Sequence, residues 1–169
     1  MVKKVIVSTF YEGNALKKAI NKLSNPEKLI LLIDDSKKGF GNEKMKNALD
    51  ELKKFYLNVL DVQVEKIKSY DLPQIIEKAS QIITKEKEKG NEIIIHITEG
   101  RKITSLGLLF AAYLNKEKVN SAYYITEEEN KLISLPLINF QIGESKKNIL
   151  KEIHKGNGEV AELQNKLKL

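Results

Sequence analysis

Residues 92–110 read Glu-Ile-Ile-Ile-His-Ile-Thr-Glu-Gly-Arg-Lys-Ile-Thr-Ser-Leu-Gly-Leu-Leu-Phe. The β-branched run 93–97 predicts a strand that is buried on both faces. The run breaks at residues 98–100, and an apolar helix is predicted from about residue 103 to residue 114. A buried strand that leads through a short turn into an apolar helix is typical of the βα units of an open α/β sheet.

The rest of the chain repeats this alternation of strand and helix. Apolar runs predict strands at residues 5–9, 29–33, 59–67, 120–126 and 131–135. Helical periodicity predicts helices over about residues 15–23, 45–56 and 73–89. Strands separated by helices of this length pair in parallel, so the predicted fold class is α/β: a Rossmann-like three-layer sandwich with a mainly parallel sheet. The polar turn 127–130 predicts an antiparallel hairpin late in the chain.

The character of the sequence changes near its C-terminal end. Residues 144–169 are predicted to form a C-terminal helical segment outside a ligand-binding domain of residues 1–143. Two short helices, joined by a tight turn at residues 156–158, resemble the opening of a helix-turn-helix. On spacing alone, a helical hairpin that packs on the sheet or on a second subunit is the alternative.

The composition excludes several classes of function. Cysteine is absent, which rules out disulfides, thiolate chemistry and thiolate metal sites. The two histidines are far apart and no carboxylate cluster has metal-ligand spacing, so no metal and no cofactor is predicted. The N-terminus lacks the apolar core of a signal peptide, and no window approaches a membrane span. We therefore expect a cytoplasmic protein with no membrane partner.

The net charge of +6 comes from lysine, and Arg101 is the only arginine. The lysines are scattered, whereas a nucleic-acid footprint requires charge gathered on one face. The bulk charge therefore decides little about partners.

Several nucleotide-binding and catalytic motifs are missing. The chain has no G-x-G-x-x-G after its first strand, no G-x-x-x-x-G-K-S/T and no G-x-S-x-G. A P-loop NTPase is therefore excluded, and a nicotinamide or flavin enzyme would lack its fingerprint. His96 lies inside a hydrophobic strand, where it is either a satisfied core or interface histidine or a side chain that reaches a ligand.

The turn at residues 98–102 is the strongest candidate for a binding site. It holds the hydroxyl of Thr98, the flexible Gly100, and the adjacent cations Arg101 and Lys102. Open α/β sheets bind ligands at the carboxyl ends of their strands, where helix N-termini present free N–H groups. Two cations are unfavourable beside a helix N-terminus, and a bound anion would offset them. A solvated strand–helix turn is the alternative.

These residues resemble motifs of the CARF domain, the CRISPR-associated Rossmann fold, and especially of the CARF–winged-helix regulators of archaeal CRISPR loci. In that family the first strand ends in a hydroxyl-rich loop, which resembles Ser8-Thr9-Phe10. The fourth strand ends in a Thr-Gly-Gly-Arg/Thr-Arg/Lys-like motif, which resembles Thr98-Glu99-Gly100-Arg101-Lys102. Residues 132–136 and 146–153 resemble the passage from the CARF domain into the winged helix. The resemblance covers essentially the whole chain.

The chain departs from the family pattern in two ways. Glu99 stands where a small residue, usually Gly, is expected. A phosphate would repel this carboxylate, so we expect Glu99 either to point away from the ligand phosphate or to contact an adenine or a ribose hydroxyl. The recognition helix and the wing are missing, so residues 144–169 are expected to be the start of a truncated winged helix.

The resemblance implies a homodimer that binds a cyclic oligoadenylate, most often the tetra-adenylate, across paired sites. The strand ends at residues 8–14, 34–36 and 98–102 would form the site in each subunit. Backbone N–H groups and cations of the 98–102 turn would contact phosphates, and an aromatic ring of the 8–14 loop would stack on adenine. The expected ligand-binding residues are Ser8, Thr9, Phe10, Tyr11, Asn14, Thr98, Glu99, Gly100, Arg101 and Lys102.

The leading hypothesis is a cyclic oligoadenylate-sensing transcriptional regulator. Ligand bound across the dimer would change how the C-terminal segment, completed in a full-length protein, binds DNA. The apolar helix 103–114 would be buried in the two-fold interface. The alternative is a metal-independent ring nuclease, in which a ribose 2′-OH attacks the adjacent phosphate. Lys102, with Ser8 or Thr9, would then be catalytic.

Overall fold

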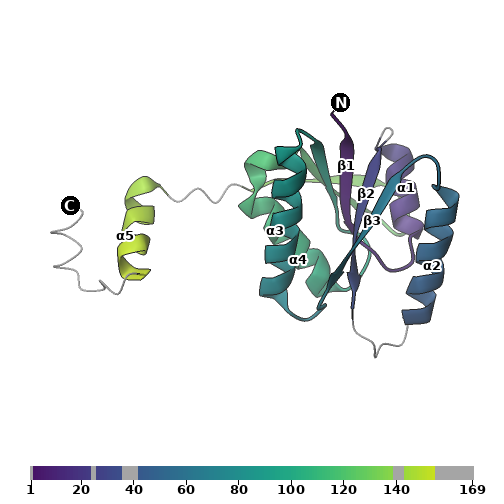
Figure 1. Ribbon diagram of the computed structural model, residues 1–169, viewed down its shortest axis with the longest axis horizontal. Helices are drawn as coiled ribbons and strands as arrows, with labels where there is room; N and C mark the ends of the chain where they lie inside the picture. Colours follow the sequence, from purple (N-terminus) through teal and green to yellow (C-terminus); the bar gives the residue numbers. More distant parts are fainter. Residues whose placement is uncertain (1, 24–25, 36–41, 139–142, 155–169) are drawn as a thin grey trace. The chain divides into compact units, whose positions relative to one another are not determined.

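The computed structural model describes residues 2–23, 26–35, 42–138 and 143–154. The chain divides into two compact units, Met1–Asn139 and Phe140–Leu169. The second unit contributes one described helix, α5 (Glu144–His154). The predicted turn at residues 156–158, and the helix predicted after it, lie outside the described residues. The first unit holds the sheet and the helices around it (Figure 1).

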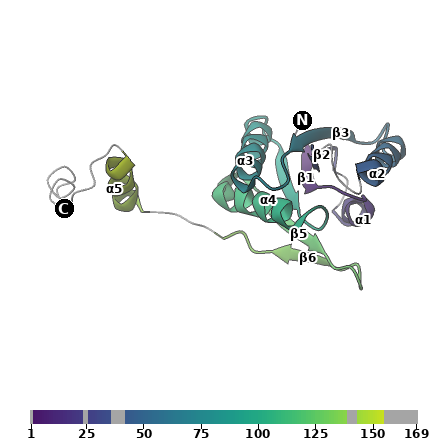
Figure 2. The ribbon, with the colours of Figure 1, turned by 90° about the horizontal axis from the view of Figure 1, so that it is seen from below.

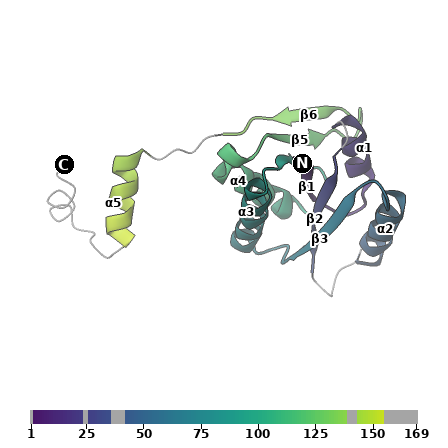
Figure 3. The same ribbon diagram turned by 45° about the horizontal axis from the view of Figure 1, so that its top comes forward.

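A six-stranded sheet forms the centre of the first unit. Its strands are β1 (Lys4–Thr9), β2 (Lys28–Asp34), β3 (Asp61–Ile67), β4 (Glu92–His96), β5 (Ser121–Ile125) and β6 (Leu132–Leu135). They lie in the order β3-β2-β1-β4-β5-β6. Five strands are parallel, and β6 pairs antiparallel with β5 at one edge of the sheet (Figure 3). The predicted mainly parallel sheet with a late antiparallel hairpin is confirmed.

Helices cover both faces of the sheet. On one face lie α1 (Asn14–Lys22) and α2 (Asn42–Phe55), and on the other lie α3 (Leu72–Glu88) and α4 (Lys102–Leu114) (Figure 2). A short 3-10 turn, η1 (Lys116–Lys118), follows α4. The predicted Rossmann-like three-layer sandwich is therefore confirmed. Among the described residues, none of the helices combines the length and the apolar composition of a membrane span.

The third strand begins later than its sequence predicts. The strand was expected from residue 59, whereas β3 begins at Asp61. The N–H groups of Val59 and Leu60 donate to the carbonyl oxygen of Tyr56 at 2.9 and 3.1 Å, so the chain closes a turn after α2 before it joins the sheet. An apolar residue in a turn is indistinguishable by composition from the first residue of a strand.

The central strand β4 is buried on both faces, as predicted. Ile93 and Ile95 pack in the hydrophobic cluster that includes α3 and α4. Ile94 points the other way and packs in the cluster that includes α1 and α2. Full burial of an isoleucine side chain contributes roughly 1.5–3 kcal/mol. Each face of the strand meets a helix layer, and the strand is apolar from Ile93 to Ile95.

The carboxyl ends of β1 and β4 lie side by side near the middle of the sheet, because the two strands pair in parallel. From β1 the chain crosses to α1 and β2, whereas from β4 it crosses over the opposite face to α4 and β5. This arrangement is a topological switch point, the place where open α/β sheets bind ligands. The β1–α1 loop (residues 10–13) and the β4–α4 loop (residues 97–101) meet there.

Candidate functional site

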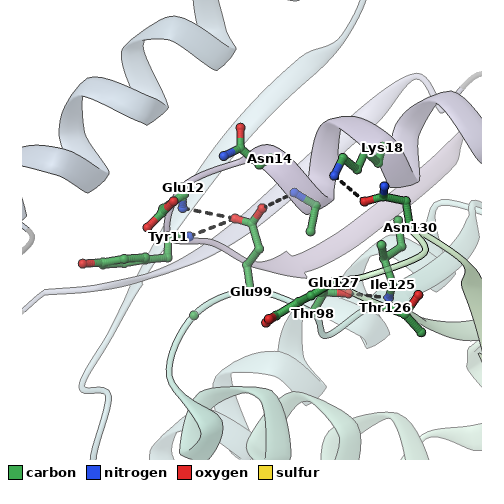
Figure 4. A pocket seen from close by; sticks show the side chains of 12 residues that line it. Tyr11, Glu12, Asn14, Lys18, Thr98, Glu99, Ile125, Thr126, Glu127 and Asn130 are labelled. Atoms are coloured by element: carbon green, nitrogen blue, oxygen red, sulfur yellow. Dashed lines mark hydrogen bonds between the residues drawn. The ribbon is translucent and has the colours of Figure 1, made fainter.

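The side chain of Glu99 joins the two loops at the switch point (Figure 4). Its Oε2 accepts hydrogen bonds from the backbone N–H groups of Tyr11 at 3.2 Å, Glu12 at 3.2 Å and Gly13 at 2.7 Å. Its Oε1 accepts from the N–H groups of Ala15 at 2.8 Å and Leu16 at 3.1 Å. One carboxylate therefore binds five backbone donors of the β1–α1 loop and of the first turn of α1.

The β1–α1 loop offers these N–H groups no local acceptor. Gly13 precedes α1 with φ at 79°, a left-handed conformation that favours glycine, and no side chain of the loop caps the helix. The first turn of α1 carries no acidic residue, although the helix dipole favours negative charge there. Glu99 supplies both the acceptor and the charge from the neighbouring loop. Neither of the two roles predicted for Glu99 included this contact.

The backbone around Glu99 is also held in place. Its carbonyl oxygen accepts hydrogen bonds from Oγ1 of Thr9 and, at 3.1 Å, from Oγ of Ser105. Gly100 follows with φ at 82°, and a Cβ added there would lie 3.2 Å from Cβ of Thr9. The left-handed φ and the close approach of the two loops therefore favour glycine at position 100.

His96 is fully buried and bridges two hydroxyl groups. Its Nδ1 lies 2.9 Å from Oγ of Ser8, and its Nε2 lies 2.9 Å from Oγ1 of Thr98. Ser8 Oγ donates to the carbonyl of Thr9 at 2.7 Å, and Thr98 Oγ1 accepts from the N–H of Ile125 at 2.7 Å. These directions assign the ring proton to Nδ1 and leave Nε2 as an acceptor.

The protonation state of His96 agrees with this network. Burial lowers the pKa of His96 to about 4, so the ring is neutral at physiological pH. A neutral ring with one N–H donor matches one hydroxyl acceptor and one hydroxyl donor. Of the two predicted roles, the satisfied core histidine is the one that these contacts support.

Three residues predicted to contact the ligand are buried. Ser8 and Thr9 have no exposed surface, and both hydroxyl groups donate to backbone carbonyls. Phe10 is 2% exposed and packs in the cluster that includes α1 and α2. Contrary to the prediction, these positions offer neither a hydroxyl nor an aromatic face to a ligand. Ser8 and Thr9 lie within β1, between β2 and β4, and Phe10 turns into the core, so all three stop short of the surface of the switch point.

Arg101 points toward the ends of neighbouring strands. Its Nε donates to Oδ2 of Asp34 at 3.3 Å, and its Nη1 donates to the hydroxyl of Tyr70 at 2.7 Å. Asp34 ends β2 and belongs to a strand end predicted to join the site. Tyr70, in the turn between β3 and α3, was not predicted, because a single exposed aromatic residue in a turn carries no functional signal by itself.

Three other predicted residues remain exposed at the same edge. Lys102 is the first residue of α4, and its ammonium group forms no ion pair or hydrogen bond with the residues that the structure describes. Asn14 begins α1 and is exposed. Tyr11 is 37% exposed, so its ring is available for stacking where that of Phe10 is not.

A pocket of about 330 Å³ opens between α1, the β4–α4 loop and the β5–β6 turn (Figure 4). We refer to it as the switch-point pocket. Five predicted site residues line it: Tyr11, Asn14, Thr98, Glu99 and Gly100. Arg101 and Lys102 are not part of its lining. The structure thus separates the predicted residues into the polar switch-point pocket and a pair of cations beside it, Arg101 and Lys102, which we refer to as the cationic patch.

The β5–β6 turn contributes residues that the sequence did not mark as functional. Thr126, Glu127 and Asn130 line the switch-point pocket, and Asn130 accepts a hydrogen bond from Nζ of Lys18 on α1. The polar composition of this turn predicted only a hairpin, whereas the pairing of β6 with β5 sets it at the carboxyl edge. Within the described part of the chain, His, Asp and Glu side chains form no group of three suited to a metal ion.

Comparison with known proteins identifies relatives of this domain. A family model described as "HFX_2341_N:-like, N-terminal" matches residues 5–130. An uncharacterized protein of Archaeoglobus fulgidus is 24% identical over 131 residues, which are 77% of this chain and 58% of that protein. The chain therefore spans less than two thirds of the length of this relative.

Two solved structures share the fold. Csm6 of Enterococcus italicus, bound to cyclic hexa-2′-fluoro-hexa-dAMP, aligns with a TM-score of 0.67 and 14% identity over 99% of this chain and 49% of its own. Can2 of Sulfobacillus thermosulfidooxidans, in complex with cyclic tetra-adenylate, aligns with a TM-score of 0.61 and 14% identity over 78% of this chain and 34% of its own. At this level of identity the likeness establishes the fold.

Proposed function

This chain belongs to the family described as "HFX_2341_N:-like, N-terminal", and from that premise we propose that residues 1–143 are a CARF domain that senses cyclic oligoadenylate. One observation carries the proposal. The switch point joins a polar pocket to an adjacent cationic patch, in a fold shared with two proteins whose structures hold cyclic nucleotides. A cyclic oligoadenylate is a ring of alternating riboses and phosphates with an adenine on each ribose, so it requires both kinds of surface.

Each exposed residue has a role in the proposed complex. Lys102 and the N–H groups at the start of α4 bind phosphate, because a helix N-terminus and an ammonium group both favour anions. Tyr11 stacks on an adenine, a contact worth ~1–3 kcal/mol per base. Asn14, at the rim of the pocket, offers both a donor and an acceptor to a base edge. The tetra-adenylate is the ring size that we expect.

We further propose that the ligand binds across a homodimer. Helix α4 exposes a row of apolar side chains, Leu106, Phe110 and Leu114. These residues recur at helical spacing and lie on the element that begins at the ligand site. A two-fold interface that contains α4 would bring two copies of the site together and match the symmetry of a cyclic ligand.

The output of the proposed sensor is transcriptional. In this proposal the helical segment 144–169 is the start of a winged helix, and DNA is the partner of a full-length protein. Helix α5 is the part of this segment that the structure describes, and its lysines, among them Lys151 in the last turn, suit an element near DNA phosphates. The ligand can change DNA binding only if it binds more tightly to one of two arrangements of the dimer than to the other.

A ring nuclease is the alternative function. It would cleave the ligand through attack of a ribose 2′-OH on the adjacent phosphate, with Lys102 stabilising the charge of the transition state. The burial of Ser8 and Thr9 weighs against this alternative, because neither hydroxyl is accessible to the ligand. The regulator is therefore the function that the geometry supports best.

Labelled cyclic tetra-adenylate tests the proposal and separates the two functions. The protein is incubated with the ligand, and chromatography then measures bound, intact and cleaved material. We expect retention of intact ligand, with any turnover slow and lost in Lys102→Ala. No retention would contradict ligand sensing. Rapid conversion without metal to linear products that end in a 2′,3′-cyclic phosphate would instead establish the nuclease.

A further inference from the structure

The β1–α1 loop has the geometry of a backbone anion site. The successive N–H groups of residues 11–13, followed by those of the first turn of α1, converge on one point. Backbone groups arranged in this way at a helix N-terminus bind phosphates in many α/β proteins. In this chain the point of convergence holds a carboxylate of the protein itself, that of Glu99.

We propose that Glu99 is a built-in anion that closes this backbone site, so that ligand phosphates bind only on the α4 side of the switch point. Glu99 is then a positioning residue, since its carboxylate holds the β1–α1 loop and touches no ligand. The statement about ligand phosphates rests on the proposed function. The closure itself does not, because it concerns contacts within the chain.

The contacts of Glu99 explain why a phosphate would not displace it. The shortest hydrogen bonds, 2.7 Å from Gly13 and 2.8 Å from Ala15, reach the two oxygens separately, so both are occupied. The backbone of Glu99 is fixed by donors from Thr9 and Ser105, which keeps the carboxylate close to the loop. A phosphate that entered would face this carboxylate at short range, where like charges repel.

The two loops would therefore contribute different groups to ligand binding. The β1–α1 loop and the start of α1 would contribute side chains, Tyr11 and Asn14, but no backbone donors, to ligand binding. The β4–α4 loop and the first turn of α4 would contribute the phosphate contacts, next to Lys102. Glu99 would thus decide which of two adjacent helix N-termini receives the ligand charge.

The closure of the backbone site by Glu99 is tested by removing its carboxylate and supplying sulfate as a free anion. Thermal unfolding of Glu99→Ala is measured against sulfate concentration, with chloride at matched ionic strength. We expect Tm to fall by roughly 5–10 °C in chloride, because five backbone donors lose a charged acceptor. Sulfate should restore most of this loss in a saturable manner. Amide resonances of Gly13 and Ala15 should shift with sulfate in the variant and not in the parent.

The matched control is Glu127→Ala, which removes an exposed carboxylate from the same pocket. Its Tm should stay near that of the parent, with no specific response to sulfate.

An unchanged Tm in Glu99→Ala, or an equal response to sulfate in all three proteins, would overturn the closure. If Glu99→Ala folds only with sulfate, the closure is supported. If it folds under no condition, Glu99→Gln decides: a Tm equal to that of the parent would overturn the proposal, and a lower Tm without a sulfate response would support it.

A second measurement tests the consequence for the ligand. Cyclic tetra-adenylate is titrated into Glu99→Ala and into the parent, both at the sulfate concentration that saturates the variant, so that competition at the start of α4 is the same in both. We expect affinities within about twofold of each other, because sulfate replaces the carboxylate without touching the ligand. If the affinity of Glu99→Ala for cyclic tetra-adenylate stays roughly tenfold or more below that of the parent, Glu99 contacts the ligand and its positioning role is overturned. Absence of binding to the parent would contradict the proposed function, while the sulfate response would still decide the closure.

Discussion

The guanidinium group of Arg101 reaches Asp34 across the carboxyl edge of the sheet, with 3.3 Å between Nε and Oδ2. The contact ties the β4–α4 loop to the end of β2, and Tyr70 holds the same guanidinium from the β3–α3 turn. The two adjacent cations of the predicted site therefore differ. Arg101 is partly neutralised by a carboxylate, whereas the exposed Lys102 forms no ion pair within the described residues.

This difference predicts unequal effects on ligand binding. Lys102→Ala should weaken the binding of cyclic tetra-adenylate by ~1–3 kcal/mol, because a charge-assisted hydrogen bond is lost. Arg101→Ala should weaken it less. Tm should barely change in either variant, since exposed cations contribute little to stability. Calorimetric titration gives the affinities, with Lys87→Ala, exposed near the end of α3, as the control. Unaltered affinity in Lys102→Ala would remove this turn from the site.

The exposed apolar row of α4 predicts a dimer in solution. Phe110, 40% exposed, is the central residue of the row, and Phe110→Glu should yield monomer or aggregate because it places a charge in the interface. Light scattering measures the mass. Leu57→Glu is the matched control, since Leu57 is 74% exposed and lies outside α4. A parent protein that is a stable monomer at micromolar concentration would exclude a ligand site shared across two copies.

Gly107 permits the close packing of α4 on α3. A Cβ added to Gly107 would lie 2.5 Å from Cγ2 of Ile75 and 3.0 Å from its Cβ. Gly107→Ala should therefore reduce the free energy of unfolding by ~1–3 kcal/mol, as overpacking of a core does. Urea denaturation measures the change. Gly90→Ala is the comparison, because a Cβ added there meets no atom within 4 Å, whereas the φ of Gly90 is 78°. Its loss of unfolding free energy should be smaller, about 1 kcal/mol, and should come from the backbone conformation alone.

The buried His96 predicts a loss of stability in mild acid. Its folded pKa of about 4 lies below the ordinary value of 6.5, so the unfolded state binds more protons between these pH values. The free energy of unfolding should therefore fall as pH falls from 6.5 to 4, by about 3 kcal/mol in total. Urea denaturation across this range measures the slope. His96→Gln should lower stability at neutral pH and flatten the slope; an equally steep slope in the variant would contradict the assignment.

Glu86 predicts a second loss of stability at lower pH. Burial alone would raise the pKa of its carboxyl group, but hydrogen bonds from Lys89, Lys28 and Asn91 outweigh burial and lower that pKa to about 2. Because the folded pKa lies below the ordinary 4.5, this contribution is present above pH 4.5 and is lost as pH falls toward 2. Its size is about 3 kcal/mol.

The variant Glu86→Gln isolates this contribution. At neutral pH it should destabilise the protein by about 3–5 kcal/mol, because Lys28, which is 5% exposed, loses its close partner. Acid titration followed by circular dichroism should then show no further loss attributable to this carboxyl group between pH 4.5 and 2. Glu88→Gln, at an exposed neighbouring position, serves as the control.

The sequence by itself predicted the fold, which is confirmed, and indicated where the candidate site lies. Hydrophobic periodicity is a local property, so the isoleucine-rich run 93–97 predicted a strand covered on both faces, which β4 is. Alternating strands and helices then predicted a parallel sheet, because crossovers of this length have few other solutions. The carboxyl ends of parallel strands meet at one edge, so the turn 98–102 could be placed beside the loop after β1.

Only the tertiary structure decided which side chains of the site are available. The parallel register pairs Ser8 with His96, and Ser8 is buried, although the family resemblance had implied that its hydroxyl contacts the ligand. Glu99 turns toward backbone donors that lie 83 to 88 positions away in the chain. Such contacts depend on strand register and loop conformation, which no spacing between residues encodes. A polar residue near a strand end thus indicates where a site lies, whereas packing determines whether its polar atoms face a ligand or the protein's own backbone.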